Sequence, residues 1–354
     1  MRIASVEVVP YALPFREPYV TAAGSLERRE MALLRLRSKE GIVGLGEAVP
    51  LSLRRGLGID QVVSELERLA ERDSLDEQTL AGDALALSPP ARCAALTALA
   101  DLRGRWAEAD RGSAPGPPSP PVRCNATLST GEPDEVASEA LAWAEDGFSS
   151  FKLKLGTGDD LGQVRAVRDA VGPSARIRVD ANGAWDVETA KRTLTELEQL
   201  DVELAEQPVA SSEEAIAVAE ATSIPIAADE SVASRADAER AVAMGAWSLT
   251  GVKLSKVGGP EAAIEIAEVI PTYVTSALDG PVGIAAAAQV AATLSAQRGG
   301  DDGLDLAHGL ATQRLFASTV AAVGCELSGE MLHAPAGPGL GVEIDEAALE
   351  AHRL

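Results

Sequence analysis

The chain has 354 residues, enough for one large domain or for a barrel with a smaller partner domain. Its formal net charge of −23 argues against nucleic acid or an anionic membrane as a partner. No uninterrupted apolar stretch reaches the length of about 18 residues that a membrane span needs. An anionic substrate must therefore be attracted by locally placed cations, because the overall field repels it.

The three cysteines, Cys93, Cys124 and Cys325, are far apart and form no Cys-x-x-Cys pair. This pattern indicates reduced, inert thiols in a cytoplasmic protein. The residues from Met1 to Val8 predict a strand and lack the apolar core of a signal peptide. We therefore expect a cytoplasmic location.

Residues 1–49 predict an antiparallel meander, with strands at 3–10, 30–37 and 42–47 and a turn at Lys39-Glu40-Gly41. Residues 13–28 are polar and contain glycine, so we expect a mobile loop there. Apolar residues recur at helical spacing over 60–72 and 90–109. The first part of the chain is therefore expected to be an α+β domain.

Residues 112–121 are rich in proline and glycine and cannot form a helix or a central strand. We interpret this segment as a linker. It divides the chain into an α+β capping domain at 1–111, a barrel at 122–310, and a C-terminal helix and tail at 311–354. The tail is expected to return to the capping domain.

The second part alternates strands and helices with short connections. Strands are expected at 122–128, 272–277 and 304–308, and at runs beginning at 151, 177, 202, 224 and 248. Helices are expected between them, at 134–145, 160–171, 186–200, 211–221, 234–244, 259–269 and 283–296. This alternation favours a parallel α/β barrel over an open sheet.

Five charged residues close successive apolar runs at intervals of 26, 26, 23 and 24 residues: Lys154, Asp180, Glu206, Asp229 and Lys253. One strand, one helix and two turns take roughly 25 residues, so the spacing predicts consecutive βα units. In a closed parallel barrel the carboxyl ends of all strands meet at one face. The spacing therefore predicts a single site in which three carboxylates lie between two ammonium groups.

Asp180, Glu206 and Asp229 would supply hard oxygen ligands from adjacent strands, which suits Mg²⁺ or Mn²⁺. The alternative is that they are solvated acids at strand ends, or ion-pair partners of the lysines. Three acids in register, flanked by lysines, favour the metal site.

Lys152 and Lys154 are two residues apart on one strand and so point to the same face. We expect Lys154 at the rim of the barrel and Lys152 one layer deeper. A metal and a second cation nearby would lower the pKa of Lys154, as a general base near neutral pH requires. Surface lysines paired with Asp159 or Asp160 are the alternative. Lys253, across the barrel, favours catalysis, because two lysines on opposite faces of a bound carboxylate could remove its α-proton to give an enediolate.

The motifs around these residues resemble those of the enolase superfamily, muconate-lactonising-enzyme subgroup. They are Lys152-Leu153-Lys154, Asp180-Ala181-Asn182-Gly183, Glu206-Gln207-Pro208, Ala228-Asp229-Glu230-Ser231 and Val252-Lys253-Leu254-Ser255-Lys256. The resemblance implies a modified TIM barrel, (β/α)₇β, with an N-terminal α+β capping domain completed by the C-terminal tail.

The same resemblance implies roles for individual residues. Asp180, Glu206 and Asp229 would bind Mg²⁺, and Lys154 and Lys253 would be the acid/base pair. Asn182 and Glu230 would support them, and Lys152 would help to neutralise a small-molecule carboxylate substrate. Homo-oligomerisation stays open.

Within the subgroup, residues 275–284 and 307–312 look like the corresponding segments of o-succinylbenzoate synthases, and residues 16–24 resemble the synthase and N-succinylamino-acid racemase loops. The Asp-x-Asp that dipeptide epimerases usually carry near strand eight is not found. The implied reaction is dehydration of 2-succinyl-6-hydroxy-2,4-cyclohexadiene-1-carboxylate in menaquinone biosynthesis.

The alternatives are an N-succinylamino-acid racemase or dipeptide epimerase, a muconate cycloisomerase, and a metal-binding barrel without catalysis. Ser276 is a candidate for substrate binding. Arg54 and Arg55 are equally well interpreted as carboxylate clamps or as an exposed turn. His308 is interpreted as structural.

Overall fold

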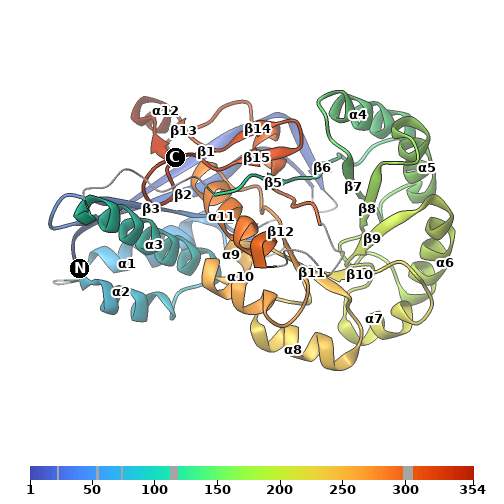
Figure 1. Ribbon diagram of the computed structural model, residues 1–354, viewed down its shortest axis with the longest axis horizontal. Coiled ribbons are helices and arrows are strands. Elements are labelled where there is room, and N and C mark those ends of the chain that lie inside the picture. The colour runs from blue at the N-terminus through green and yellow to red at the C-terminus, as the bar shows by residue number, and fades with distance from the viewer. Residues whose placement is uncertain (22–23, 53–55, 73–74, 112–118, 298–305) are drawn as a thin grey trace.

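The structure is a computed structural model that describes residues 1–21, 24–52, 56–72, 75–111, 119–297 and 306–354 (Figure 1). It contains a four-stranded antiparallel sheet with its helices and a seven-stranded parallel sheet ringed by helices. Arg54, Arg55 and most of the expected linker at 112–121 lie outside the described residues.

The antiparallel sheet has the strand order β3-β2-β1-β4. Its strands are β1 (Arg2–Thr21), β2 (Gly24–Ser38), β3 (Val43–Ala48) and β4 (Leu75–Asp76), and it packs against α1 (Ile59–Ala70), α2 (Glu77–Ala84) and α3 (Pro89–Arg111). Alternate residues of β2, such as Leu34, face these helices, and Met31 and Leu33 on the opposite face are buried in the core that continues into the barrel. A Cβ atom at Gly46 would lie 2.0 Å from the carbonyl oxygen of Ala94, so glycine lets β3 approach α3 this closely.

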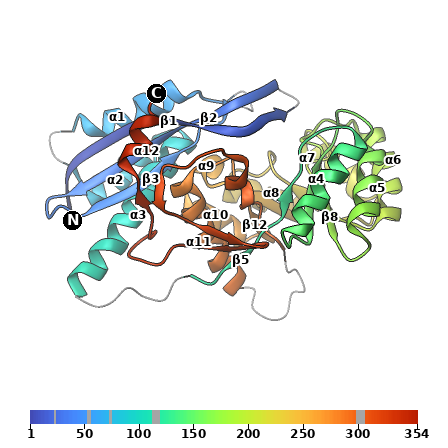
Figure 2. The same cartoon turned by 90° about the horizontal axis from the view of Figure 1, so that it is seen from above.

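The expectation of a loop at residues 13–28 was wrong. β1 and β2 continue to pair as a long hairpin as far as Thr21 and Gly24, with an irregularity in the register between Pro14 and Tyr19. The polar residues that suggested a loop fall partly in this irregular stretch. We call the part of this hairpin at residues 13–21 and 24–28 the β1–β2 arm. Aromatic packing stabilises the arm, because the ring of Phe15 stacks on those of Tyr19 and Phe316 at centroid distances of 5.5 and 5.0 Å. Figure 2 shows the arm projecting from the capping sheet toward the barrel helices.

The parallel sheet has the strand order β12-β11-β10-β9-β8-β7-β6 and curls into a barrel (Figure 1). Its strands are β6 (Ala126–Thr127), β7 (Ser150–Lys154), β8 (Arg176–Asp180), β9 (Val202–Glu206), β10 (Ile226–Ala228), β11 (Leu249–Val252) and β12 (Thr272–Val274). The intervening helices are α4 (Pro133–Glu145), α5 (Asp160–Val171), α6 (Val187–Leu197), α7 (Ser212–Ala219), α8 (Arg235–Met244), α9 (Leu254–Val257) and α10 (Pro260–Ala267), followed by α11 (Pro281–Gln297). The predicted (β/α)₇β barrel with a capping domain is confirmed.

The eighth strand, expected at 304–308, is reduced in the described part of the chain to two single-residue bridges. His308 pairs with Cys124 and Gly309 with Thr275, which closes the ring between its first and last strands. The imidazole Nδ1 of His308 accepts a hydrogen bond from the backbone N–H of Val274 at 3.0 Å, so a side chain replaces a carbonyl in the ladder. This buried contact supports the structural interpretation of His308.

The C-terminal residues return to the capping domain. After a 3₁₀ turn (Ala311–Leu315), they form β13 (Ala321–Val323), β14 (Glu326–Ser328), β15 (Met331–His333), β16 (Glu343–Ile344) and α12 (Glu346–Ala351). The helix expected within residues 311–354 is α12, which lies near the end of the chain. The last residues add backbone hydrogen bonds to β1, from Ala12 N–H to His352 C=O at 2.9 Å and from Leu354 N–H to Pro10 C=O at 3.1 Å. None of the helices in the described part of the chain is long and apolar enough to cross a membrane.

The buried carboxylate of Asp101 on α3 joins three segments. It accepts from the backbone N–H groups of Leu45 at 2.8 Å and Leu340 at 2.7 Å, and from Arg105 Nε at 2.8 Å. We expect Asp101→Asn to lower the free energy of unfolding by about 2–4 kcal/mol, because Arg105 loses its buried charge partner. Urea titration measures this loss. The exposed Glu196→Gln should change stability by less than about 0.5 kcal/mol, and an equal effect of both variants would contradict the assignment.

A second buried acid, Glu47 at the end of β3, lies against the first turn of α11. It accepts from Gly280 N–H at 2.6 Å and from the Tyr11 hydroxyl at 2.8 Å. Burial, with Asp279 nearby, raises the pKa of Glu47 to about 7, although the hydrogen bonds from Tyr11, Gly280 and Val282 oppose the shift.

The folded state therefore holds a proton at Glu47 that the unfolded chain releases at lower pH. We expect this contribution to stability to be complete below about pH 4.5 and to fall, by on the order of 3 kcal/mol, as the pH rises to about 7. Glu47→Gln should remove this part of the dependence of the unfolding free energy on pH. The measurement is the difference in unfolding free energy between wild type and variant across that range, and a constant difference would refute the prediction. Asp279, whose pKa burial also raises, stays present in both proteins.

Candidate active site

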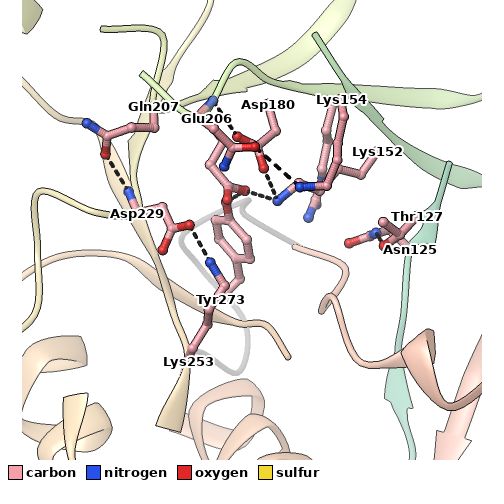
Figure 3. Close-up of polar contacts among 12 residues, drawn as sticks. Asn125, Thr127, Lys152, Lys154, Asp180, Glu206, Gln207, Asp229, Lys253 and Tyr273 are labelled. Atoms are coloured by element: carbon pink, nitrogen blue, oxygen red, sulfur yellow. Dashed lines mark hydrogen bonds and ion pairs between the residues drawn. The ribbon is translucent and has the colours of Figure 1, made fainter. Parts of the chain in front are cut away.

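The residues singled out by their spacing meet at the carboxyl ends of neighbouring strands (Figure 3). Lys154 pairs with Asp180 across β7 and β8, and Asp180 pairs with Glu206 across β8 and β9. Asp229 directly follows β10, and Lys253 follows β11 at the start of α9. Because the strands are parallel and in register, the equal sequence spacing becomes one row of charged side chains at the barrel mouth.

Lys152 lies deeper than Lys154 and binds two of the three acids. Its Nζ is 2.9 Å from Asp180 Oδ2 and 2.7 Å from Glu206 Oε2. Burial lowers the pKa of Lys152, but Asp180, Glu206 and Asp229 outweigh it and raise the pKa well above its usual value. Burial likewise raises the pKa of Asp180, yet Lys152 and Lys154 lower it to about 2. Lys152 is therefore a fixed cation and Asp180 a fixed anion near neutral pH.

The third acid, Asp229, is fully buried and lies between two lysines. Lys253 Nζ forms an ion pair with its Oδ2, and Lys256 Nζ lies 3.0 Å from its Oδ1. The side chain of Gln207 supports the same strand end, because its Oε1 accepts from the backbone N–H groups of Asp229 at 2.9 Å and Ser231 at 3.3 Å. Asp229 is thus held by both its side chain and its backbone.

Lys154 lies nearer to solvent than Lys152. Its Nζ donates to Asn182 Oδ1 at 3.3 Å, and Asn182 Nδ2 in turn contacts Glu230 Oε1 at 3.5 Å. The backbone N–H of Asn182 also binds Asp180 Oδ1 at 2.9 Å. Asn182 and Glu230 therefore connect the partly exposed lysine to the row of acids.

The donor set fits a hard divalent cation. Asp180, Glu206 and Asp229 supply oxygen atoms from adjacent strands, and the buried Oε1 of Glu206 has no hydrogen-bond partner among the described residues. As the side chains stand, no three acidic, histidine or cysteine groups in the described ranges are gathered closely enough to hold an ion. Lys152 and Lys253 balance the acids in this arrangement, so an ion would share the carboxylates with these lysines.

Ser276, the candidate for substrate binding, has its hydroxyl group bound to Asp279. Its hydroxyl donates to Asp279 Oδ2 at 2.7 Å and also accepts from the Asp279 backbone N–H at 2.8 Å, in the turn that follows β12. Side-chain contacts and the strand register bring together eight of the nine predicted site residues, and Ser276 lies in the turn after β12.

Three residues near the acids received no role from the sequence: Lys256, Gln207 and Tyr273. Lys256 lies three residues after Lys253, one turn along α9, and this helical spacing could have indicated it. Gln207 belongs to the Glu206-Gln207-Pro208 motif. Tyr273 reaches Glu206 from β12, 67 residues later in the chain, and no local pattern signals that contact.

Comparison with known families assigns both parts of the chain. Residues 3–110 match the family model "Mandelate racemase / muconate lactonizing enzyme, N-terminal domain", and residues 135–348 match "Enolase C-terminal domain-like". The chain belongs to the enolase superfamily, in the muconate-lactonising-enzyme subgroup, as the motifs predicted.

Its relatives cover several reactions. An o-succinylbenzoate synthase of Thermobifida fusca is 38% identical over 213 residues, which are 58% of this chain and 64% of that protein, slightly under two thirds of its length. A D-Ala-D/L-Ala epimerase of Cytophaga hutchinsonii is 30% identical over 82% of this chain and 84% of its own. An L-Ala-D/L-Glu epimerase of Bacillus subtilis is 28% identical over the whole of both chains.

Solved structures show the same fold. The dipeptide epimerase of Cytophaga hutchinsonii, complexed with Mg and D-Ala-L-Val, has a TM-score of 0.87 at 26% identity and covers 99% of this chain and 98% of its own. A muconate lactonizing enzyme of Pseudomonas fluorescens, complexed with muconolactone, has a TM-score of 0.86 at 28% identity and covers 99% of each. The relatives thus include lyases, epimerases and cycloisomerases, and epimerases match as strongly as the synthase.

Proposed function

We propose that this chain is a Mg²⁺-dependent enzyme that removes the α-proton of a carboxylate substrate. The observation that carries the proposal is the placement of Lys154 and Lys253 on opposite sides of three buried carboxylates (Figure 3). A proton bound to the α-carbon of an ordinary carboxylate is weakly acidic, so its removal requires both a base and strong stabilisation of the developing negative charge. Asp180, Glu206 and Asp229 would hold Mg²⁺, which supplies that stabilisation as a Lewis acid when bound.

Within this class we propose o-succinylbenzoate synthase, acting in menaquinone biosynthesis. The highest identity among the relatives described above, 38%, is to a synthase, and the segments after β12 and around His308 resemble those enzymes. The substrate would be 2-succinyl-6-hydroxy-2,4-cyclohexadiene-1-carboxylate.

In the proposed reaction Lys154, as a neutral amine, takes the α-proton of the substrate. It then returns this proton to the departing hydroxyl group on the same face, which releases water and completes the aromatic ring. Lys253 stays protonated and stabilises the developing negative charge from the other face. Lys152, kept cationic by Asp180 and Glu206, contributes positive charge to a mouth that the net charge of −23 would otherwise make repulsive to an anion.

A racemase or epimerase is the second candidate, because the same pair of lysines could exchange protons on both faces of an α-carbon. The epimerase relatives of Cytophaga and Bacillus match more of the chain than the synthase does. N-succinylamino acids and dipeptides are the substrates to test. In D₂O, a racemase would place deuterium at the α-carbon of both enantiomers, and each lysine-to-alanine variant would lose exchange with one of them.

We expect Lys154→Ala to reduce turnover of the cyclohexadiene substrate by about 10²–10⁴-fold, because the base is removed while the three carboxylates stay in place. The loss of ultraviolet absorbance of the substrate, with Mg²⁺ present, measures the rate. Lys191→Ala, on the outer helix α6, is the matched control and should retain the wild-type rate. Undiminished turnover by Lys154→Ala would refute the assignment of the base. An inactive wild type that still binds Mg²⁺ would direct the search to the racemase substrates.

The metal site is tested separately by titration calorimetry with Mg²⁺ and no substrate. We expect one ion to bind per chain and Glu206→Gln to weaken binding at least about tenfold, because a buried carboxylate charge is lost. Glu196→Gln, an exposed acid on α6, should leave binding unchanged. Wild-type protein that binds no Mg²⁺, or a Glu206→Gln variant that binds it equally well, would rule out this metal site.

A further inference from the structure

Tyr273 crosses the inside of the barrel to reach one of the three acids. It lies on β12 and is fully buried. Its hydroxyl is 2.5 Å from Glu206 Oε2 on β9, the third strand from β12 in the sheet (Figure 3). The aromatic ring packs in a small cluster of the barrel interior with Leu204, Ala227, Leu249 and Leu306. A rigid apolar ring thus carries a single hydroxyl group to the row of charges.

The neighbouring strand is shaped for this ring. Gly251 on β11 pairs directly with Tyr273, and a Cβ atom at Gly251 would lie 2.9 Å from the ring carbon Cζ and 3.0 Å from the hydroxyl oxygen. Because real Cβ contacts are not this short, any larger residue at Gly251 would displace the tip of the tyrosine. The guanidinium of Arg178, 5.4 Å from the ring centroid, also packs against the ring.

Two donors share one oxygen atom of Glu206. Lys152 Nζ, at 2.7 Å, and the Tyr273 hydroxyl both bind Oε2, whereas Oε1 has no hydrogen-bond partner among the described residues. A carboxylate held by one oxygen cannot rotate about its Cγ–Cδ bond without breaking both contacts. Its other oxygen therefore keeps one orientation.

We infer that Tyr273, accommodated by Gly251, is a positioning residue that fixes Glu206 so that Oε1 is presented for a divalent cation. The inference rests on the proposed function, because it requires the Mg²⁺ site. Outer contacts of this kind typically contribute ten- to a hundredfold to metal affinity, since the ligand no longer has to be ordered when the ion binds. Tyr273 does not touch the reacting atoms in this role.

The first test is Tyr273→Phe, which removes the hydroxyl and keeps the ring in its place beside Gly251. We expect its dissociation constant for Mg²⁺, measured by calorimetry without substrate, to rise about tenfold. Tyr11→Phe is the matched control: Tyr11 is also fully buried and its hydroxyl also binds a buried carboxylate, that of Glu47, but outside the site. It should reduce thermal stability without changing the affinity for Mg²⁺.

A second variant, Gly251→Ala, keeps the hydroxyl but displaces it. We expect it to weaken Mg²⁺ binding too, and to add little further loss in the Tyr273→Phe background, because the contact is already absent. Because Tyr273→Phe and Gly251→Ala disturb the same contact in different ways, one of them still tests the inference if the other is unstable. Wild-type affinity in Tyr273→Phe would overturn the inference while leaving the proposed function intact. Absence of Mg²⁺ binding by the wild-type protein would overturn both. Equal losses in Tyr273→Phe and Tyr11→Phe would show a general effect of stability and also overturn the inference.

Discussion

The burial of three carboxylates at one end of the barrel is the constraint on which the rest of the site depends. Removing an ionised carboxylate from water costs several kcal/mol even in a relaxed protein, and Asp180, Glu206 and Asp229 are each at most 1% exposed. Lysines bring the compensating charge. Lys152 binds the first two acids, and Lys253 and Lys256 bind the third. A site that gathers buried carboxylates thus also determines where its cations must lie.

This charge balance depends on strand register. A shift of one residue in a strand turns every side chain to the opposite face, so Lys152 would leave the barrel interior and Asp180 and Glu206 would lose their common cation. The register is fixed elsewhere, by the apolar layers of the barrel and by closure of the ring through the bridges of His308 and Gly309. The capping domain is joined to the tail and to the barrel by separate buried contacts, those of Asp101 and Glu47. The residues that close the barrel, distant from the acids in the sequence, therefore contribute to the geometry of the acids.

The sequence predicts much of this arrangement because βα units repeat at nearly constant length. The positions of Lys154, Asp180, Glu206, Asp229 and Lys253 follow from the repeat, and so does their common face. The pairing of β1 with β2 beyond Pro14 could not be predicted from local patterns, because Phe15 packs on Phe316, some 300 residues later. Tyr273 was missed for the same reason. Local patterns report strands and helices, whereas contacts across a closed barrel depend on how all of its strands curl.

Different contacts hold the charged site and the segments that resemble particular members of the subgroup. The acids and lysines occupy strand ends, where a change of residue disturbs the charge balance. In the described part of the chain, other contacts hold the β1–β2 arm and the turn after β12. Phe15 packs on Tyr19 and Phe316, and Ser276 binds Asp279. This separation explains physically how relatives with one fold and similar sequences include synthases, epimerases and cycloisomerases.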